Sequence, residues 1–199
     1  MENIALNNKR HSLAHVLAMA ILQAYPEAKL TLGPAIDTGF YYDIDFGTNK
    51  PTEENLKELT KAMQKIVRKG ATFSHKEVSK DEALTHFANN SYKSELIKEI
   101  AEKGEAITLY TTDWFTDLCR GGHVDDLKDI DPESFKLEKI AGAYWRGDEK
   151  NPMLTRVYGL AFDTKAELDA YVTQQEEAKK RDHRKLGKEL GLFVFSDLI

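Results

Sequence analysis

Two pairs of metal-ligating residue types, far apart in the sequence, set the strongest constraint on how this chain folds. His11 and His15 are four residues apart in a segment of helical periodicity, so both imidazoles are expected on one helix face, one turn apart. Cys119 and His123 have the same spacing but flank a Gly-Gly pair that disfavours a helix, so we expect them on a tight loop. We predict that the four side chains meet in one pocket, which requires a helix near the start of the chain to face a loop about a hundred residues later.

Three histidines and one cysteine permit several kinds of chemistry. Zinc could fill all four positions as a structural ion, or could activate a water held in an open position. Without metal, the imidazoles could orient and deprotonate a water as general bases. A Cys119 nucleophile with His123 as its base is the least favoured route, because the sequence directs four groups at one place. The plain alternative for Cys119 is a buried structural thiol, and His75 and His86 are expected to be core histidines without a role.

The rest of the chain predicts a mixture of helices and strands. Asn7 or Asn8 is expected to cap the first helix, whose dipole would lower the pKa of both histidines, and Gly70 to end the second. A capping box at Thr164 opens a long charged helix with little apolar content, typical of a solvent-bridging arm. The predicted helices are 9–25, 53–68, 79–88, 92–100 and 165–190, and the predicted strands are two around a Gly-Pro turn within 29–46, then 73–78, 106–110, 135–140, 143–145 and 154–162.

Composition narrows the class of protein. The chain has no apolar run of the ~20 residues that a membrane span needs, and its first ten residues lack the pattern of a signal peptide. A single cysteine excludes an internal disulfide framework and predicts a cytoplasmic location. A net charge of −5 argues against broad, nonspecific nucleic-acid binding, but a local basic patch could still grip an RNA end. The candidate patch, whose alternative is scattered surface charge, comprises Lys136, Lys139, Arg146, Lys150 and Arg156.

Five motifs in combination resemble bacterial threonyl-tRNA synthetases over about residues 9–195. The first and third are also similar to the editing domains of alanyl-tRNA synthetases, whereas the central three indicate threonine. The motifs are HSLAH (11–15), GPAIDTGFYYD (33–43), DLCRGGH (117–123), KIAGAYWRGD (139–148) and RDHRKLGKEL (181–190).

The resemblance implies an α+β fold in which antiparallel sheets pack with helices, the second-additional-domain editing fold. It places an editing domain at 1–163 and a linker helix at 164–199 that leads to a class II catalytic core. The implied activity is hydrolysis of serine from mischarged threonine tRNA, within a parent enzyme that joins threonine to its tRNA with ATP. The implied partners are that tRNA and the class II core, with no membrane. The parent would be a homodimer and the fragment a candidate monomer. No cofactor is required by the resemblance, although zinc is expected as an option because the alanyl-type relatives hold it with the same four residue types.

Carried over by position, the resemblance also implies site residues. Lys93 belongs to a Tyr-Lys segment that looks like the family's, and it or a free amide of the Gly-Gly loop could face the oxyanion. His123 or His11 could take the proton, and Asp117 could hold the substrate ammonium or merely cap the loop. One of the tyrosines could stack on the terminal adenine, although core packing is the commoner fate of such residues. The implied catalytic residues are His11, His15, Lys93, Asp117, Cys119 and His123. The candidate zinc ligands among them are His11, His15, Cys119 and His123. The implied substrate-binding residues are Gly33, Pro34, Tyr41, Tyr42, Gly121, Gly122, Tyr144 and Arg146.

Three departures qualify this resemblance. The family usually has proline where this chain has Gly122. A small ubiquitin-like domain would be expected before the editing domain, and the class II core would be expected after Ile199. The chain is therefore expected to be a fragment of a synthetase, which the long C-terminal helix favours, or a freestanding deacylase. A module that binds zinc or an aminoacylated tRNA end without cleaving it is the remaining alternative.

Overall fold

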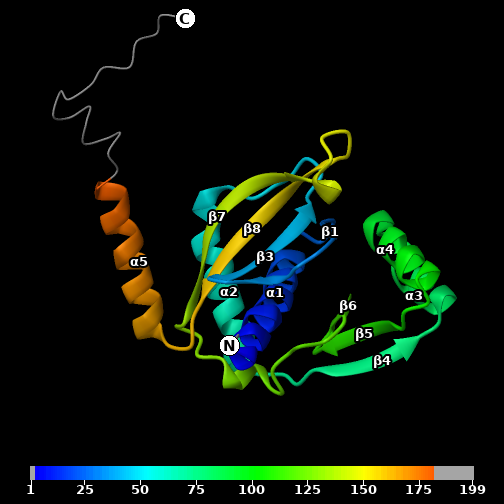
Figure 1. The fold of residues 1–199 in the computed structure, drawn as a ribbon, viewed down its shortest axis with the longest axis horizontal. Helices are drawn as coiled ribbons and strands as arrows, with labels where there is room; N and C mark the ends of the chain where they lie inside the picture. Colours follow the sequence, from blue (N-terminus) through cyan, green and yellow to red (C-terminus); the bar gives the residue numbers. More distant parts are fainter. Residues whose placement is uncertain (1–2, 182–199) are drawn as a thin grey trace, which may run out of the picture.

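The architecture, seen in a computed structural model that describes residues 3–181, is α+β with two antiparallel sheets (Figure 1). The larger sheet has the strand order β1-β3-β8-β7, with β2 also paired to β3, and the smaller sheet has the order β4-β5-β6. This confirms the predicted fold class. The helices are α1 (Ile4–Ala24), α2 (Leu56–Lys69), α3 (Lys80–His86), α4 (Ser91–Glu102) and α5 (Lys165–Lys180). The strands are β1 (Lys29–Leu30), β2 (Ala35–Ile36), β3 (Gly39–Asp45), β4 (Ser74–Val78), β5 (Ile107–Thr112), β6 (Phe115–Leu118), β7 (Phe135–Tyr144) and β8 (Met153–Ala161).

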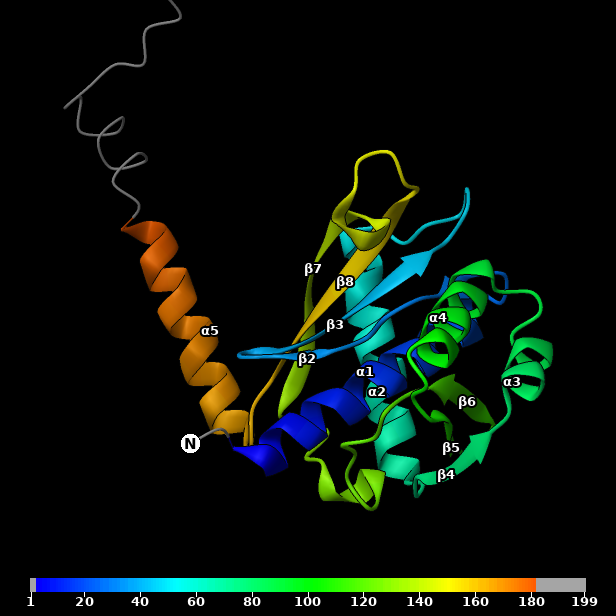
Figure 2. The same cartoon turned by 45° about the vertical axis from the view of Figure 1, so that its right-hand side comes forward.

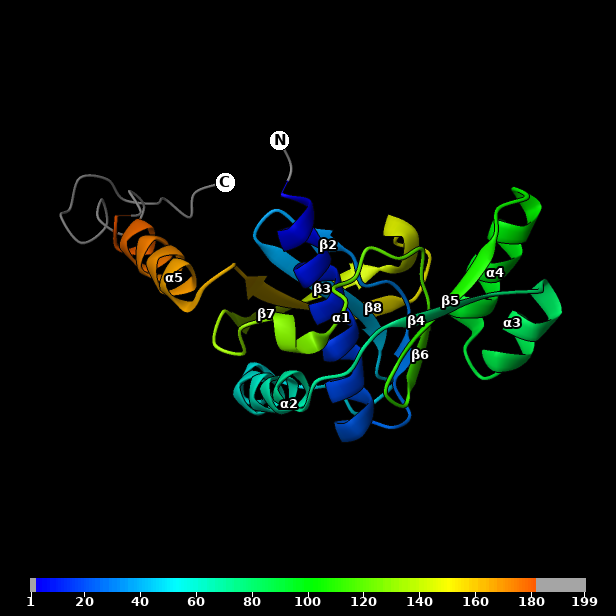
Figure 3. The same ribbon diagram turned by 90° about the horizontal axis from the view of Figure 1, so that it is seen from below.

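Helix α1 runs through the middle of the molecule, with α2 and β7 on one side and the smaller sheet with α3 and α4 on the other (Figure 3). Every residue from Ser12 to Ile21 is buried, because α1 packs against α2, β2 and β3 rather than presenting a single apolar stripe. The helix also begins earlier than predicted. Asn3 is the cap and accepts from the Leu6 amide, so the prediction of a cap at Asn7 or Asn8 is wrong.

The larger sheet is built from two adjoining hairpins. Gly33 and Pro34 do not form the predicted turn. They interrupt an edge strand whose two parts, β1 and β2, both pair with β3, and the reversal comes after Ile36. The predicted strands 135–140 and 143–145 are one strand, β7, with a bulge between Leu137 and Lys139, and it pairs with β8 as the predicted hairpin. One face of β3 supplies the core, where Phe40, Tyr42 and Ile44 are fully buried.

The smaller sheet forms a second unit with helices α3 and α4 and its own apolar cluster (Figure 2). It begins where α2 ends at Gly70, whose φ of 74° allows the chain to leave the helix as predicted. Ser79 caps α3 as predicted, by accepting from the Glu82 amide. The chain returns to the larger unit beside its point of departure, since Leu127 donates to the Ala71 carbonyl. The seam between the two units holds the candidate site.

Helix α5 extends away from the two sheets (Figures 1 and 2). Thr164 caps it by accepting from the Glu167 amide, as predicted. The Glu167 carboxylate accepts from the amide of Asp163, one residue before the cap, so only half of the predicted capping box forms. Only Leu168 is buried on this helix, which agrees with the predicted solvent-bridging arm. Residues 182–190 of the predicted helix lie outside the described residues. No described helix combines the length and the apolar composition needed to cross a membrane.

Candidate functional site

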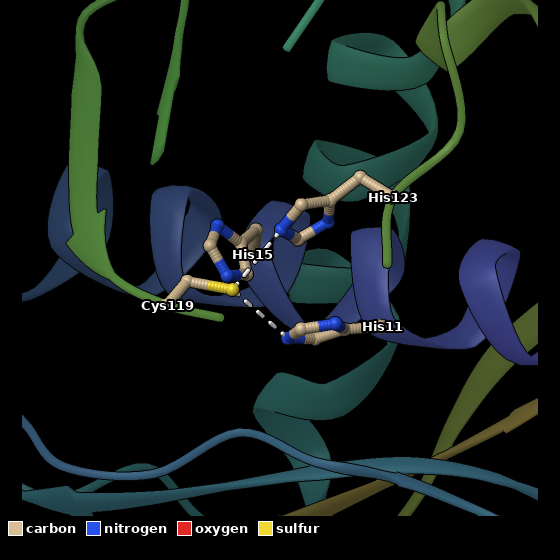
Figure 4. Close-up of side chains that lie close together, drawn as sticks. All are labelled: His11, His15, Cys119 and His123. Atoms are coloured by element: carbon tan, nitrogen blue, oxygen red, sulfur yellow. Dashed lines mark hydrogen bonds between the residues drawn. The ribbon is translucent and has the colours of Figure 1, made fainter. Parts of the chain in front are cut away.

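The four metal-ligating side chains converge as the sequence predicts. His11 and His15 project from α1, and Cys119 and His123 face them from the loop that follows β6 (Figure 4). One ligand atom from each of the four lies within 4.8 Å of the others. The Cys119 Sγ atom is 3.5 Å from Nε2 of His11 and 3.2 Å from Nε2 of His123.

Two consecutive glycines shape the loop that carries the second pair. Gly121 and Gly122 have φ values of 95° and 85°, a region that other residues rarely adopt. The loop folds back so that the Gly121 amide donates to Cys119 Sγ over 3.3 Å. A proline in place of Gly122 would require a φ near −65°, so the loop takes a path here that the family's usual proline would not allow.

A serine missed by the sequence reasoning anchors the loop to α1. The Ser12 hydroxyl accepts from the Val124 amide over 3.1 Å and lies 3.3 Å from Nδ1 of His123. The sequence signal that could have identified Ser12 is its position directly after His11, but a serine hydroxyl there has no property that separates it from other polar residues. The contact with Nδ1 orients the His123 ring with its Nε2 atom toward the sulfur.

Burial keeps all four groups uncharged at neutral pH. Desolvation lowers the pKa of His11, lowers that of His15 well below its ordinary value, and lowers that of His123 to about 2. Desolvation also raises the pKa of the Cys119 thiol to about 11. The predicted helix-dipole effect is not the cause, because His11 lies about two turns inside α1 and the dipole acts within the first turn.

The donor set fits a zinc ion. Tetrahedral zinc with ordinary ligand lengths places a thiolate sulfur about 3.5 Å from an imidazole nitrogen, close to the two S–N distances observed. Neutral imidazoles are also the metal-binding form. In the described part of the chain, Nδ1 of His15 is buried and has no hydrogen-bond partner, which marks the cluster as a site with unsatisfied donor or acceptor capacity.

A cavity of about 600 Å³ lies in the seam beside this cluster. It has walls from both units of the fold, and nine of the residues implied by the resemblance contribute to them. These are His11, His15, Gly33, Pro34, Tyr41, Tyr42, Lys93, Asp117 and Cys119. The remaining five do not line the cavity; they are Gly121, Gly122, His123, Tyr144 and Arg146.

His123 lies behind the cavity wall rather than in it. Its ring is stacked between Phe73, at a centroid distance of 4.2 Å, and His11, at 4.4 Å. With a pKa near 2 it has little tendency to accept a proton, so its position suits a ligand or a ring that orients His11.

A buried ion pair forms the floor of the cavity. Lys93 Nζ lies 2.5 Å from Asp117 Oδ1, which also accepts from the Leu118 amide. The Tyr42 hydroxyl donates to the other carboxylate oxygen over 2.5 Å. Burial and the neighbouring carboxylate together raise the pKa of Tyr42 well above its ordinary value. Asp117 thus joins α4 and β3 through its side chain, while its bond to Leu118 is the local contact expected of a loop cap.

Further cavity residues missed by the sequence reasoning come from α4 and from the residue that caps its C-terminus. Leu96, Ile100 and Lys103 follow Lys93 at intervals of three, seven and ten residues, which is one helix face. Helical periodicity starting from Lys93 would have identified them. The prediction that His75 and His86 lie in the core is wrong, because both side chains are exposed.

Two cations of the predicted basic patch are already paired. Arg156 forms a bidentate pair with Asp43 at 2.6 and 2.8 Å and covers the Tyr41 ring at 3.9 Å. Arg146 pairs with two carboxylates of α4. The lysines of the patch make no ion pair among residues 3–181; these are Lys136, Lys139 and Lys150.

Comparison with known proteins agrees with this geometry. The sequence profile of the threonyl and alanyl tRNA synthetase second additional domain matches residues 107–158, which carry β5, β6, the Gly-Gly loop and most of the β7–β8 hairpin. Residues 107–158 are therefore similar to the threonyl and alanyl tRNA synthetase second additional domain.

Relatives of this domain extend the similarity to almost the whole chain. The chain is 48% identical over 194 residues to a threonine–tRNA ligase of Borreliella burgdorferi, covering 98% of this chain and 33% of that protein. It is 53% identical over 184 residues to a threonine–tRNA ligase of Dehalococcoides mccartyi, covering 92% of this chain and 31% of the relative. The chain thus spans about a third of the length of the curated relatives it matches.

Proposed function

We propose that this chain is the editing part of a threonine–tRNA ligase and hydrolyses serine from mischarged threonine tRNA. The observation that carries this proposal is the arrangement of three ionisable groups from α1, α4 and the end of β6 around one cavity: His11, Lys93 and Asp117. The cavity volume lies within the range of small-ligand sites, which suits the aminoacyl end of a tRNA. The threonine–tRNA ligases among its relatives support the choice of tRNA and amino acid.

Hydrolysis of an aminoacyl ester needs an activated water and donors for the oxyanion that develops. His11 is the better placed base, because it lines the cavity and its partner candidate His123 does not. Lys93 has three N–H donors, of which one is used by Asp117 and a second reaches the Tyr42 hydroxyl at 3.4 Å. The third remains for an oxyanion.

The other proposed substrate contacts also depend on which hydrogen-bonding positions remain free. The two carboxylate oxygens of Asp117 have about four acceptor positions and accept three hydrogen bonds, so one position remains for the substrate ammonium. The Gly121 amide is used by Cys119, and neither Gly121 nor Gly122 lines the cavity, which favours Lys93 for the proposed oxyanion role. Tyr41 lines the cavity and is the better candidate to contact the terminal adenine, although Arg156 covers one face of its ring, whereas Tyr144 lies outside the cavity.

Zinc is proposed as an optional component of this site. His11, His15, Cys119 and His123 would hold it. With all four bound, the tetrahedral set would be complete, the ion would stabilise the fold, and His11 would not act as the base. The ion would supply a bound water beside the ester only with three of these ligands in place. A Cys119 nucleophile is less consistent with the site, since a thiol of pKa about 11 is almost entirely protonated at neutral pH.

Selectivity is proposed to follow the logic of a second sieve. One methyl group gives a binding site only ~1–3 kcal/mol of preference, so a synthetase site that accepts threonine accepts some serine. A second site that admits only the smaller amino acid removes the error. We therefore expect seryl ester to be cleaved far faster than threonyl ester.

Deacylation of both esters by the purified chain tests the proposal. We expect turnover of seryl-tRNA by the wild type, and its loss in His11→Ala and Lys93→Ala variants that remain folded by circular dichroism. His86→Ala is the matched control, because His86 is exposed and outside the cavity. Equal rates for the two esters would contradict selective editing, and binding of tRNA without turnover would favour a binding module. Repeating the assay with chelator separates metal-free hydrolysis from a zinc-dependent or zinc-folded domain.

The remaining partner assignments extend the same proposal. A class II catalytic core would adjoin α5, and the parent enzyme would be a homodimer. Size-exclusion chromatography of this chain by itself tests the further expectation that it is a monomer.

A further inference from the structure

We infer that Arg146, at the tip of the β7–β8 hairpin, is a positioning residue that holds α4 in place and thereby sets how large an acyl group the cavity admits. The selectivity part of this inference rests on the proposed editing function. The inference differs from the expectation that Arg146 grips RNA, because it assigns the guanidinium to carboxylates of this chain.

The cavity has one wall that needs such a support. Its walls belong to the two units of the fold, with α1 and the β1–β3 edge on one side and α4, β5 and β6 on the other. The α4 wall includes Lys93, Leu96 and Glu99. Any shift of α4 away from β3 would therefore widen the cavity and move Lys93 relative to His11.

Arg146 and its neighbour grip α4 at successive turns. Arg146 Nε donates to Glu95 over 2.7 Å, and a terminal nitrogen of the same guanidinium donates to Glu99. Trp145 Nε1 donates to the other Glu95 oxygen over 3.1 Å. The Trp145 side chain is 5% exposed and packs edge-on against Tyr92, one residue before Lys93, at 5.2 Å. Both oxygens of Glu95 are thus used by the hairpin.

The backbone of Arg146 gives an independent sign that this contact is specifically maintained. Its φ is 58°, a left-handed conformation that long side chains rarely adopt and that glycine adopts freely. The turn is held by Asn151, whose side-chain Nδ2 donates to the Trp145 carbonyl over 3.0 Å. A strained residue that is kept in such a turn indicates a role for its side chain.

Two variants of Arg146 and one matched control test the inference. Arg146→Gly removes both ion pairs and relieves the strained φ, whereas Arg146→Lys keeps the charge. Arg68→Ala is the control, because it breaks an exposed ion pair of similar length, 2.6 Å to Glu133, that does not line the cavity. For each protein we would measure kcat and KM for seryl and threonyl esters, and hydrogen exchange of the α4 amides.

We expect Arg146→Gly to lower the seryl-to-threonyl ratio of kcat/KM about tenfold, the order of discrimination that one methyl group supplies. We also expect α4 amides to exchange faster in this variant, with Arg146→Lys intermediate and Arg68→Ala unchanged. An unchanged ratio with unchanged α4 exchange would overturn the inference, and a higher KM for both esters with neither change would identify Arg146 as a phosphate contact instead. A wild type that hydrolyses neither ester would overturn the proposed function. Unchanged hydrogen exchange of the α4 amides in Arg146→Gly would, even then, overturn the inference that Arg146 holds α4 in place.

Discussion

The ammonium of Lys93 lies 2.5 Å from a carboxylate oxygen of Asp117 although the two side chains are only 2% and 4% exposed. The pair links α4 to β6 within the smaller unit, and the Tyr42 hydroxyl connects it to β3 of the larger one. A single buried network therefore forms the floor of the candidate site and joins the two units.

Breaking this pair on one side should be strongly destabilising. In Lys93→Met the Asp117 charge stays buried without its partner, so we expect urea unfolding to show a decrease of about 3–5 kcal/mol in unfolding free energy. Lys76→Met, which removes an exposed pair with Glu82, should cost less than ~1 kcal/mol. The double variant Lys93→Met with Asp117→Leu should recover part of that stability. A single variant no less stable than the Lys76 control would contradict the buried charge pair.

Adding one methyl group to the Gly-Gly loop should disturb the site. At Gly121 a Cβ would be strained by the positive φ and would also run into the Tyr110 hydroxyl. At Gly104 φ is also positive, but a Cβ would meet nothing within 4 Å. We expect Gly104→Ala to cost ~1 kcal/mol of unfolding free energy and Gly121→Ala distinctly more. Equal decreases in stability, by thermal or urea unfolding, would remove the argument from close packing.

The buried histidines should make the metal-free protein acid-sensitive. Their folded-state pKa values are lowered, so between the ordinary value of 6.5 and the folded values the unfolded chain binds more protons than the folded one. Stability is therefore expected to fall as the pH drops below about 6.5, by up to ~1.4 kcal/mol per pH unit for each histidine. Urea titrations from pH 7 to pH 4 would measure this slope. His123→Gln should reduce it and the exposed His86→Gln should not; a flat profile would show that the imidazoles are accessible to protons.

Zinc should stabilise the protein through the four-residue cluster. An ion that binds the folded chain alone raises the unfolding free energy by RT ln(1 + [Zn]/Kd), about 2.7 kcal/mol at a hundredfold excess over Kd. We expect added zinc to raise the Tm of the wild type, and chelator to reverse the rise. His15→Ala should abolish the response, whereas His75→Ala, an exposed histidine outside the cluster, should keep it. Identical responses in the two variants would place the ion elsewhere.

Three lysines of the β7–β8 region remain candidates for RNA phosphates. Replacing Lys136, Lys139 and Lys150 by alanine should reduce the slope of log K against log salt for tRNA binding by about 0.7–0.9 for each phosphate that a lysine no longer neutralises. Substitution of three lysines of α2, at 57, 61 and 65, is the matched control for net charge. The same slope in both triple variants would show that the predicted patch does not bind phosphate.

Local spacing predicted much of the fold. The period-2 pattern of Phe40–Phe46 identified β3, and Ser79 and Thr164 identified two helix starts, because each signal depends on residues within one or two turns. The prediction of a turn at Gly33 and Pro34 was wrong because it also depended on local sequence alone. Two short strands interrupted by Gly-Pro along one partner look locally like a hairpin, and only their pairing with β3 distinguishes the two arrangements.

For the candidate site too, local spacing predicted some features and packing between distant segments decided the others. Helical and loop spacing were enough to group His11 and His15, and Cys119 and His123, since spacing determines the direction of side chains within an element. Which of them line the cavity was decided by packing: Phe73, from a different segment, stacks on His123 and keeps it behind the wall. The carboxylates that neutralise Arg146 and Arg156 also come from distant segments.

The sequence by itself determined most of the helices and strands, the charged C-terminal helix and the meeting of two residue pairs, because periodicity and glycine chemistry act over a few neighbouring residues. Only the tertiary structure decided the charge states of that cluster, the Lys93–Asp117–Tyr42 network and the grip of Arg146 on α4. Desolvation and ion pairing depend on which segments exclude water from a group and which bring a partner to it, and those segments lie tens of residues away along the chain.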